Sequence, residues 1–126
     1  MIFGVGIDLM KVSRIRQVVE RYGDRFLKRI FTLSEITFCE RLADRFPSYA
    51  ARFAAKEAFS KALGTGLRGI VSWQEIEVCD NERSRPTIKV FGRAKEILGH
   101  RRVHLSLTHL EDYAAAVVVI EEHTYR

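Results

Sequence analysis

The chain has 126 residues, 47% of them hydrophobic and 29% charged, which is enough for one globular domain and excludes a disordered or fibrous protein. Its longest apolar run, Tyr113 to Ile120, is far shorter than the ~20 residues that span a bilayer, so we expect no membrane partner. The net charge of +5 is concentrated in residues 1–68, which carry 13 basic and 7 acidic side chains. This asymmetry indicates an anionic partner (a nucleic acid, a polyphosphate ligand or an acidic protein) or simply a basic surface.

The chain begins with a predicted strand that is followed by two helices. A β-type apolar run covers residues 1–9, and the strand it predicts is expected to end at Asp8. A helix is expected over residues 14–22, because Ser13 is a suitable N-cap and Gly23 a suitable stop. A second, short helix is expected to start at Asp24.

Two further helices complete the helical half of the sequence. Thr32 and Glu35 have the spacing of a capping box and predict a third helix that ends before Pro47. Ser48 is expected to cap the longest helix, over residues 49–63, which Gly64 ends.

The second half changes to an alternating, strand-like pattern. Four strands are predicted, over residues 75–78, 87–90, 103–108 and 113–120. A polar turn joins the first two, a short helix over residues 93–98 precedes the third, and the fourth has the pattern of a fully buried strand. Together these elements predict an α+β fold, a single domain over residues 1–126 with helices packed on a mainly antiparallel sheet that the N-terminal strand joins.

The cysteines and the N-terminus indicate the compartment. Cys39 and Cys79 have no C-x-x-C spacing, which favours free thiols in a reducing environment over a disulfide or zinc site. No basic stretch precedes the apolar start of the chain, so a signal peptide is not expected. We therefore expect a cytoplasmic protein.

Asp8 is a carboxylate in an otherwise apolar run, beside Gly6. Such a group is costly to bury unless it lies at the end of a sheet with a cation or N–H donors. It is either a ligand for a hard cation such as Mg²⁺ or a helix or turn cap just before Lys11.

Glu57 and Lys61 lie four residues apart on the predicted longest helix and therefore share a face. The simple interpretation is a surface ion pair, but the flanking alanines and phenylalanines are typical of a packed face. A Mg²⁺–phosphate pair would engage both groups, with the metal at Glu57 and the phosphate at Lys61. The backbone amides after Gly64 could face that phosphate, although a plain helix stop explains Gly64 equally well.

Two polar patterns remain. His104, Ser106 and Thr108 alternate along a predicted strand and are followed by His109. This pattern indicates either a face that binds phosphate or adenine, with His104 able to move a proton, or a solvated strand face. The spacing of the histidines is unsuitable for zinc. Arg14 and Arg21 form a basic helix face, suited either to an acidic protein helix or to solvent.

Three of these segments together resemble one family, in its order and spacing and over nearly the whole chain. The segments are Gly4-Val5-Gly6-Ile7-Asp8 through Arg14-Ile15; Phe53-x-x-Lys56-Glu57-Ala58-x-x-Lys61-Ala62-x-Gly64-Thr65-Gly66; and His104-Leu105-Ser106-Leu107-Thr108-His109 followed by Tyr113-Ala114-Ala115-Ala116. They resemble the holo-[acyl-carrier-protein] synthases, the small, one-lobed bacterial type within the 4′-phosphopantetheinyl transferase superfamily.

The resemblance implies a transferase with a specific reaction. Such an enzyme moves the 4′-phosphopantetheine arm of coenzyme A onto a serine of apo-acyl carrier protein, depends on Mg²⁺ and releases adenosine 3′,5′-bisphosphate. The family serves fatty acid and lipid biosynthesis. It implies a homotrimer with coenzyme A bound at a subunit boundary, and no nucleic acid partner.

The resemblance also implies roles for the metal and phosphate residues. Asp8 and Glu57 match the Mg²⁺ ligands, Lys61 matches a phosphate contact, and Gly64 lies in the loop beside the pyrophosphate. Met10 stands where the tandem members of the superfamily have a second acid, which agrees with the small type.

Further implied roles concern coenzyme A, the carrier and the proton. Ser106, Thr108 and His109 match the strand that faces coenzyme A, and Arg14 matches the contact to the carrier's acidic helix, with Arg21 on the same basic face. The proton acceptor stays open between a water on the metal and one of three side chains, Glu57, Glu35 or His104.

Two other functions remain as alternatives. A basic nucleic-acid-binding module would suit the charge, although the sequence has no helix-turn-helix, zinc-finger or aromatic-stacking pattern. A Mg²⁺-dependent phosphatase or nucleotide-binding protein would use the same carboxylates.

Overall fold

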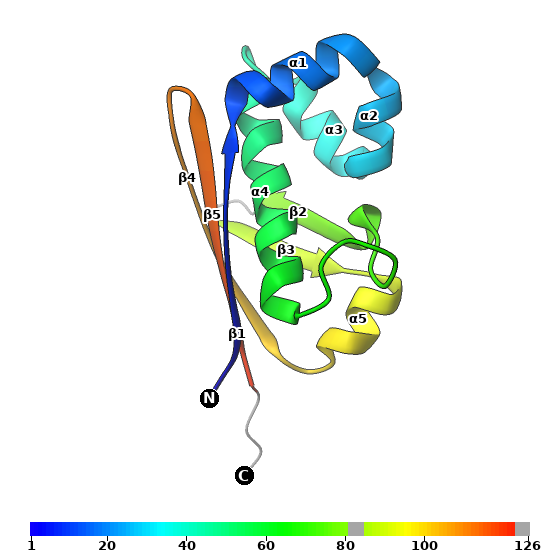
Figure 1. The fold of residues 1–126 in the computed structure, drawn as a ribbon, viewed down its shortest axis with the longest axis vertical. Coiled ribbons are helices and arrows are strands. Elements are labelled where there is room, and N and C mark those ends of the chain that lie inside the picture. Colours follow the sequence, from blue (N-terminus) through cyan, green and yellow to red (C-terminus); the bar gives the residue numbers. More distant parts are fainter. Residues whose placement is uncertain (81–84, 123–126) are drawn as a thin grey trace.

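Three long strands form the sheet on which the other elements are built. In the computed structural model, which describes residues 1–80 and 85–122, the strand order is β1 (Ile2–Lys11), β5 (Tyr113–Glu121) and β4 (Arg102–Leu110), all antiparallel (Figure 1). The N-terminal strand thus joins the sheet, and the expected α+β class is confirmed. A separate two-stranded sheet consists of β2 (Ile76–Asp80) and β3 (Pro86–Val90); the polar turn expected between them falls outside the described residues.

The observed helix bounds agree best with the sequence prediction where residues close by in the chain set the start or end of the helix. Their bounds are α1 (Val12–Tyr22), α2 (Asp24–Ile30), α3 (Leu33–Glu40), α4 (Phe46–Leu63), the 3₁₀ turn η1 (Trp73–Glu75) and α5 (Gly92–Leu98). The capping box is confirmed, because the Thr32 hydroxyl accepts from the Glu35 amide and the Glu35 carboxylate accepts from the Thr32 amide. Gly64 ends α4 with φ of 90°. None of the described helices is long and apolar enough to span a membrane.

Two predicted caps are wrong. Helix α1 starts one residue before Ser13, and the amide of Val12 donates to the backbone oxygen of Asp112, in the β4–β5 turn, at 2.7 Å. Helix α4 starts before Ser48, at Phe46, whose amide donates to the Asp44 carboxylate at 3.2 Å. Helix α3 ends at Glu40, before Pro47 as predicted, and Pro47 itself lies in the first turn of α4.

Helix α4 lies against β1 at a distance that only glycine allows. A Cβ atom on Gly6 would be 1.8 Å from the carbonyl oxygen of Ala58, and one on Gly4 would be 1.9 Å from that of Ala62. Because Ala58 and Ala62 are four apart, they form one stripe of the helix, and this stripe sits on the glycines of the strand. The contact fixes the spacing of the two elements that carry the candidate ligands.

The outer face of the three-stranded sheet is apolar and bare. Helix α4 covers the inner face, and no described element covers the outer one (Figure 1). Val5, Ile7 and Leu9 are 59%, 67% and 62% exposed there. The expectation of a fully buried strand over residues 113–120 is therefore wrong, because buried and partly exposed side chains alternate along β5 and Tyr113 is 45% exposed.

Candidate active site

The structure brings Asp8 and Lys61 together from distant parts of the chain. Asp8 points toward α4, because it has the same parity along β1 as Gly4 and Gly6. The ammonium group of Lys61 is 3.1 Å from the Asp8 carboxylate and 3.1 Å from the carbonyl oxygen of Ile7. The sequence predicted that the strand ends at Asp8. This is wrong, because β1 continues to Lys11.

Glu57, one turn before Lys61 on α4, completes the charged cluster. Partial burial and the nearby Asp8 carboxylate raise the pKa of Glu57, while Lys61 and Arg68 act in the opposite direction. Two mutually repelling carboxylates with hard oxygen donors fit a divalent cation such as Mg²⁺. Among the described residues, no group of three or more His, Cys, Asp and Glu side chains could hold a metal ion. The protein thus offers two ligands, and other ligands would come from water or substrate.

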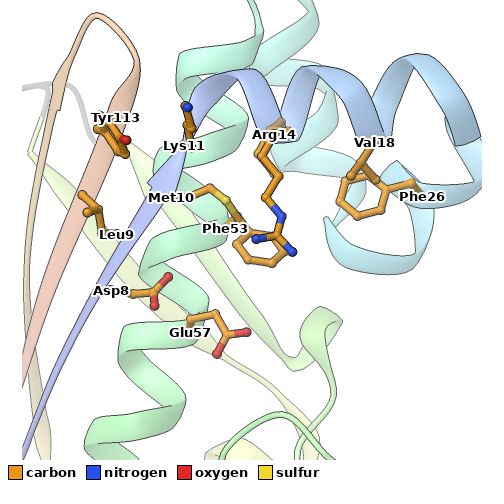
Figure 2. A pocket seen from close by; sticks show the side chains of 11 residues that line it. Asp8, Leu9, Met10, Lys11, Arg14, Val18, Phe26, Phe53, Glu57 and Tyr113 are labelled. Atoms are coloured by element: carbon orange, nitrogen blue, oxygen red, sulfur yellow. The ribbon is translucent and has the colours of Figure 1, made fainter.

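An open cavity of about 580 Å³ lies over this cluster. Figure 2 shows Asp8 and Glu57 close together at one side of the cavity, which Arg14 of α1 and Phe53 of α4 also line. Phe26 of α2 forms part of the wall. Arg14 lines this cavity, whereas Arg21 does not and has its guanidinium over the ring of Tyr22; the predicted carrier contacts of both arginines stay predictions.

The glycine-rich loop after α4 acts mainly as a helix stop. The amides of Gly64, Thr65 and Gly66 all donate to the carbonyl oxygen of Ser60, at 3.0–3.2 Å. These amides therefore satisfy the end of the helix and do not form a set of free donors for a phosphate. A Cβ on Gly64 would meet nothing within 4 Å, so this side of the loop is open beside Lys61.

The polar strand β4 lies on a different part of the surface from Asp8. Asp8 pairs with Ala116, which pairs with Leu107, and these three share the inner face of the sheet. Ser106 and Thr108 flank Leu107 and are exposed on the outer face. Within one chain the sheet therefore separates them from the carboxylates.

The two histidines of β4 have different surroundings. His104 is on the outer face with Ser106, and its Nε2 is 3.0 Å from Glu121. Both His104 and Ser106 line a cavity of about 520 Å³ with Pro86. His109 has the opposite parity from Thr108, and the two line the rim of a third cavity, of about 470 Å³, beside Arg52.

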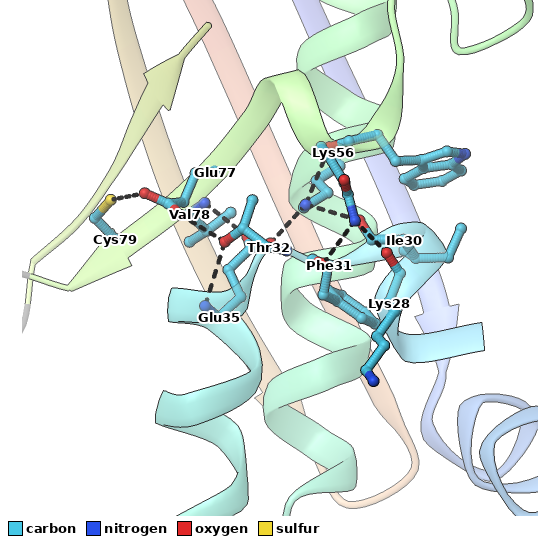
Figure 3. A network of polar contacts seen from close by, with 11 residues as sticks. Lys28, Ile30, Phe31, Thr32, Glu35, Lys56, Glu77, Val78 and Cys79 are labelled. Carbon is cyan, nitrogen blue, oxygen red and sulfur yellow. Dashed lines mark hydrogen bonds and ion pairs between the residues drawn. The ribbon is translucent and has the colours of Figure 1, made fainter. Parts of the chain in front are cut away.

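Glu35 is not available as a proton acceptor. Its carboxylate is fully buried and 2.6 Å from the ammonium group of Lys56, which is also fully buried (Figure 3). It also accepts hydrogen bonds from the amides of Thr32 and Val78, both at 2.8 Å. Burial lowers the pKa of Lys56, and Glu35 opposes that effect. The sequence had suggested no separate role for Lys56, because the apolar residues around it resemble those around Lys61.

Sequence reasoning also missed a groove beside the candidate site. Val18, Tyr22, Arg25, Phe26 and Arg29 line a cavity of about 420 Å³ between α1 and α2. Val18 and Phe26 also line the cavity over Asp8 and Glu57, so the two hollows adjoin. The sequence does show basic and apolar side chains alternating on two neighbouring helices, which could have indicated this groove. Only the packing of α1 against α2 shows that these side chains line one hollow.

Comparison with known proteins identifies the class. The family model of the 4′-phosphopantetheinyl transferase superfamily matches residues 4–118. The chain is 50% identical to the holo-[acyl-carrier-protein] synthase of Koribacter versatilis over 125 residues, which are 97% of this chain and 100% of the relative. The chain therefore belongs to the 4′-phosphopantetheinyl transferase superfamily and, within it, to the holo-[acyl-carrier-protein] synthases.

Solved structures have the same fold. A holo-(acyl-carrier-protein) synthase from Bacillus anthracis, in complex with coenzyme A (3′,5′-ADP), has a TM-score of 0.84 and 37% identity, and covers 98% of this chain and 99% of that chain. The holo-[acyl-carrier-protein] synthase from Neisseria meningitidis has a TM-score of 0.87 and 37% identity, with coverage of 97% and 100%. The Helicobacter pylori protein, in complex with coenzyme A, has a TM-score of 0.83 and 32% identity, with coverage of 93% and 99%.

Proposed function

We propose that residues 1–126 form a single domain that transfers 4′-phosphopantetheine from coenzyme A to a serine of an apo-acyl carrier protein. The reaction depends on Mg²⁺ and releases adenosine 3′,5′-bisphosphate. The observation that carries this proposal is the pair of carboxylates, Asp8 and Glu57, in a cavity that Arg14 also lines, with Lys61 bonded to Asp8. Membership of the holo-[acyl-carrier-protein] synthases supports the same reaction.

Asp8 and Glu57 are the proposed metal ligands. Their oxygen donors and the raised pKa of Glu57 indicate an excess of negative charge that a divalent cation would relieve. Bound there, Mg²⁺ supplies charge neutralisation for a pyrophosphate and makes its phosphorus more electrophilic. Lys61 is the proposed phosphate contact, because its side chain is half exposed, its ammonium group is bonded to Asp8, and it is a compact point charge.

The proton of the attacking serine hydroxyl needs an acceptor. With Glu35 engaged by Lys56, the remaining side-chain candidates are Glu57 and His104. Glu57 lines the cavity, whereas His104 would have to come from a neighbouring subunit, since it lies on the outer sheet face. The geometry of a single chain thus favours Glu57.

The carrier has a suitable docking path across α1 and α2. The groove between them is lined by Arg25 and Arg29 with an apolar floor, and it adjoins the Glu57 cavity through Phe26. An acidic helix in this groove would be attracted by these arginines and by Arg14 and Arg21 nearby. A serine at the end of such a helix would then arrive over the metal site.

Coenzyme A is proposed to bind between subunits of a homotrimer. Relatives from Bacillus anthracis and Helicobacter pylori are complexes with coenzyme A. In this chain, Ser106 lines one hollow along β4, and Thr108 and His109 line another. Ser106 and Thr108 are on the other face of the sheet from Asp8, to which Lys61 is bonded. A closed ring of subunits would let the β4 hollows of one chain face the Lys61 cluster of the next.

The bare outer sheet face supports this assembly. Val5, Ile7 and Leu9 are exposed in a row on β1, next to the partly exposed Val117 and Val119 of β5. A contiguous apolar face of this kind is typical of a subunit interface. The expected cytoplasmic location and a role in fatty acid and lipid biosynthesis are parts of the same proposal, to which the free Cys39 and Cys79 add modest support.

The test is incubation with coenzyme A, MgCl₂ and an apo-acyl carrier protein, followed by intact-mass measurement of the carrier. We expect the mass gain of one phosphopantetheine, the appearance of adenosine 3′,5′-bisphosphate, and loss of both after chelation. Asp8→Asn should remain folded and lose most of the activity. Phosphate release from coenzyme A without a carrier would favour a phosphatase instead, and an unmodified carrier with no other product would refute the proposal.

A further inference from the structure

Helix α2 is too short to be stable without contacts from the rest of the chain. It has seven residues, and isolated helices of this length do not persist in water. The carbonyl groups at its C-terminal end lack partners within the helix and must find them elsewhere. Side chains from two other elements supply those partners, and they fix where the helix lies.

Lys56 is the first of these side chains. Its ammonium group donates to the carbonyl oxygen of Ile30, the last residue of α2, at 2.9 Å, and to that of Trp73 in η1 at 3.1 Å (Figure 3). Its third partner is the Glu35 carboxylate at 2.6 Å. All three N–H donors of the lysine are thus used. Lys56 precedes Glu57 on α4, so the turn that presents the candidate metal ligand also holds the end of α2.

Gln74 is the second side chain, and it reaches α2 from η1. Its amide nitrogen donates to the carbonyl oxygens of Lys28 and Phe31, the latter at 3.3 Å. The neighbouring Trp73 stacks on Phe53, with ring centroids 4.8 Å apart, and Phe53 lines the Glu57 cavity. The 3₁₀ turn therefore connects the wall of that cavity to the end of α2.

The helix held in this way forms part of both hollows described above. Phe26 of α2 lines the Glu57 cavity and the groove between α1 and α2, and Arg25 and Arg29 line the groove. A shift of α2 would move these side chains relative to Glu57. It would not move Lys61, which is on α4 and bonded to β1.

We infer that Lys56 and Gln74 are positioning residues, which hold the carrier-docking helix α2 at a fixed place relative to Glu57 through its backbone carbonyl groups. This inference rests on the proposed function, because it concerns how the carrier's serine is aligned with the metal site. It predicts that weakening the clamp impairs use of the carrier while use of coenzyme A is unaffected.

Gln74 offers the cleaner test, because its side chain is exposed and carries no charge. Replacement of Lys56 would leave Glu35 buried without its partner, and the protein could fail to fold. Gln74→Met keeps the size and the neutrality of the side chain and removes the donor. Gln74→His keeps an N–H donor and is the matched control.

The measurements are KM for the apo-carrier, KM for coenzyme A and kcat, at two salt concentrations. For Gln74→Met we expect KM for the carrier to rise about fivefold, as for the loss of one hydrogen bond, with KM for coenzyme A unchanged within about twofold. The ratio to wild type should be the same at both salt concentrations, because no charge has changed. Gln74→His should recover most of the loss.

Amide hydrogen exchange gives a readout that does not depend on activity. In Gln74→Met, amides of residues 24–31 should exchange faster than in the wild type, and those of α4 should not. If the wild-type enzyme is active and Gln74→Met has an unchanged KM for the carrier, or equal increases in both KM values, the inference is wrong and the proposed function still stands. Unaltered exchange in residues 24–31 would also overturn the inference. A wild-type chain that modifies no carrier would refute the proposed function, and the exchange data would still report whether the clamp exists.

Discussion

Replacing Gly6 by alanine tests whether the contact between β1 and α4 sets the geometry of the site. The added Cβ would lie 1.8 Å from the carbonyl oxygen of Ala58, whereas close contacts between carbon and oxygen are about 3.3 Å. The helix and strand must therefore separate by about 1.5 Å. Overpacking of this kind costs about 1–3 kcal/mol, which lowers Tm by roughly 4–12 °C in a chain of this size.

The same displacement should affect catalysis more than stability. Asp8 is two residues beyond Gly6 on the strand, and Glu57 is on the displaced helix, so their separation changes directly. A misplacement of about 1 Å in an active site can reduce the rate about 100-fold. We expect a loss of that size in the carrier-modification rate, together with weaker activation by Mg²⁺ in a titration.

Gly99→Ala is the matched control for this experiment. Gly99 has φ of 62° and ψ of −133°, a backbone conformation used almost only by glycine, and a Cβ there would meet nothing within 4 Å, so the substitution adds backbone strain of about 1–3 kcal/mol without contact with another residue. Its stability should fall modestly and its activity should stay near that of the wild type. Equal activities for Gly6→Ala and Gly99→Ala, measured at a temperature where both are folded, would refute the reasoning.

Three further predictions concern the interface, the metal ligand and the carrier. Ile7→Glu, on the bare sheet face, should convert the proposed trimer to monomers in analytical ultracentrifugation and lower activity at least about tenfold, whereas Thr37→Glu on exposed α3 should change neither. Since the pKa of Glu57 is raised in the folded chain, its ionised form opposes folding; Glu57→Gln should therefore raise Tm at pH 7 without metal, lose that gain below about pH 4, and lack activity. A lower Tm for Glu57→Gln at pH 7 would contradict this sign. Arg14→Ala should raise KM for the carrier about threefold to tenfold at low salt, with a smaller effect at high salt.

Local signals in the sequence predicted local structure well. The capping box of Thr32 and Glu35 and the stop at Gly64 depend on neighbours three or four residues away, and both are present. The caps predicted at Ser13 and Ser48 failed because other groups satisfy those helix starts. The start of α1 uses the backbone oxygen of Asp112, about 100 residues away in sequence, which no local pattern reveals.

The candidate site was predictable in its composition and less so in its arrangement. The period of the helix placed Glu57 and Lys61 on one side. That Asp8 joins them was implied only by the family resemblance, and the pairing and parity of β1 in the structure explain why it does. The sequence did not distinguish Lys56 from Lys61, because both lie among alanine and phenylalanine residues on the same helix. Five residues at about 100° each turn the two lysines to different sides, and only the packing decides which side is buried.

The glycine-to-alanine contact between β1 and α4 limits how this protein can be redesigned. The carboxylates of Asp8 and Glu57 come from segments 49 residues apart in sequence, and their alignment depends on the missing side chain of Gly6, which lets β1 approach the backbone of Ala58. A larger residue at Gly6 would displace both carboxylates at once. Efforts to change carrier preference should therefore alter the walls of the cavity, at Phe26 and Phe53, and leave the strand and helix backbones as they are.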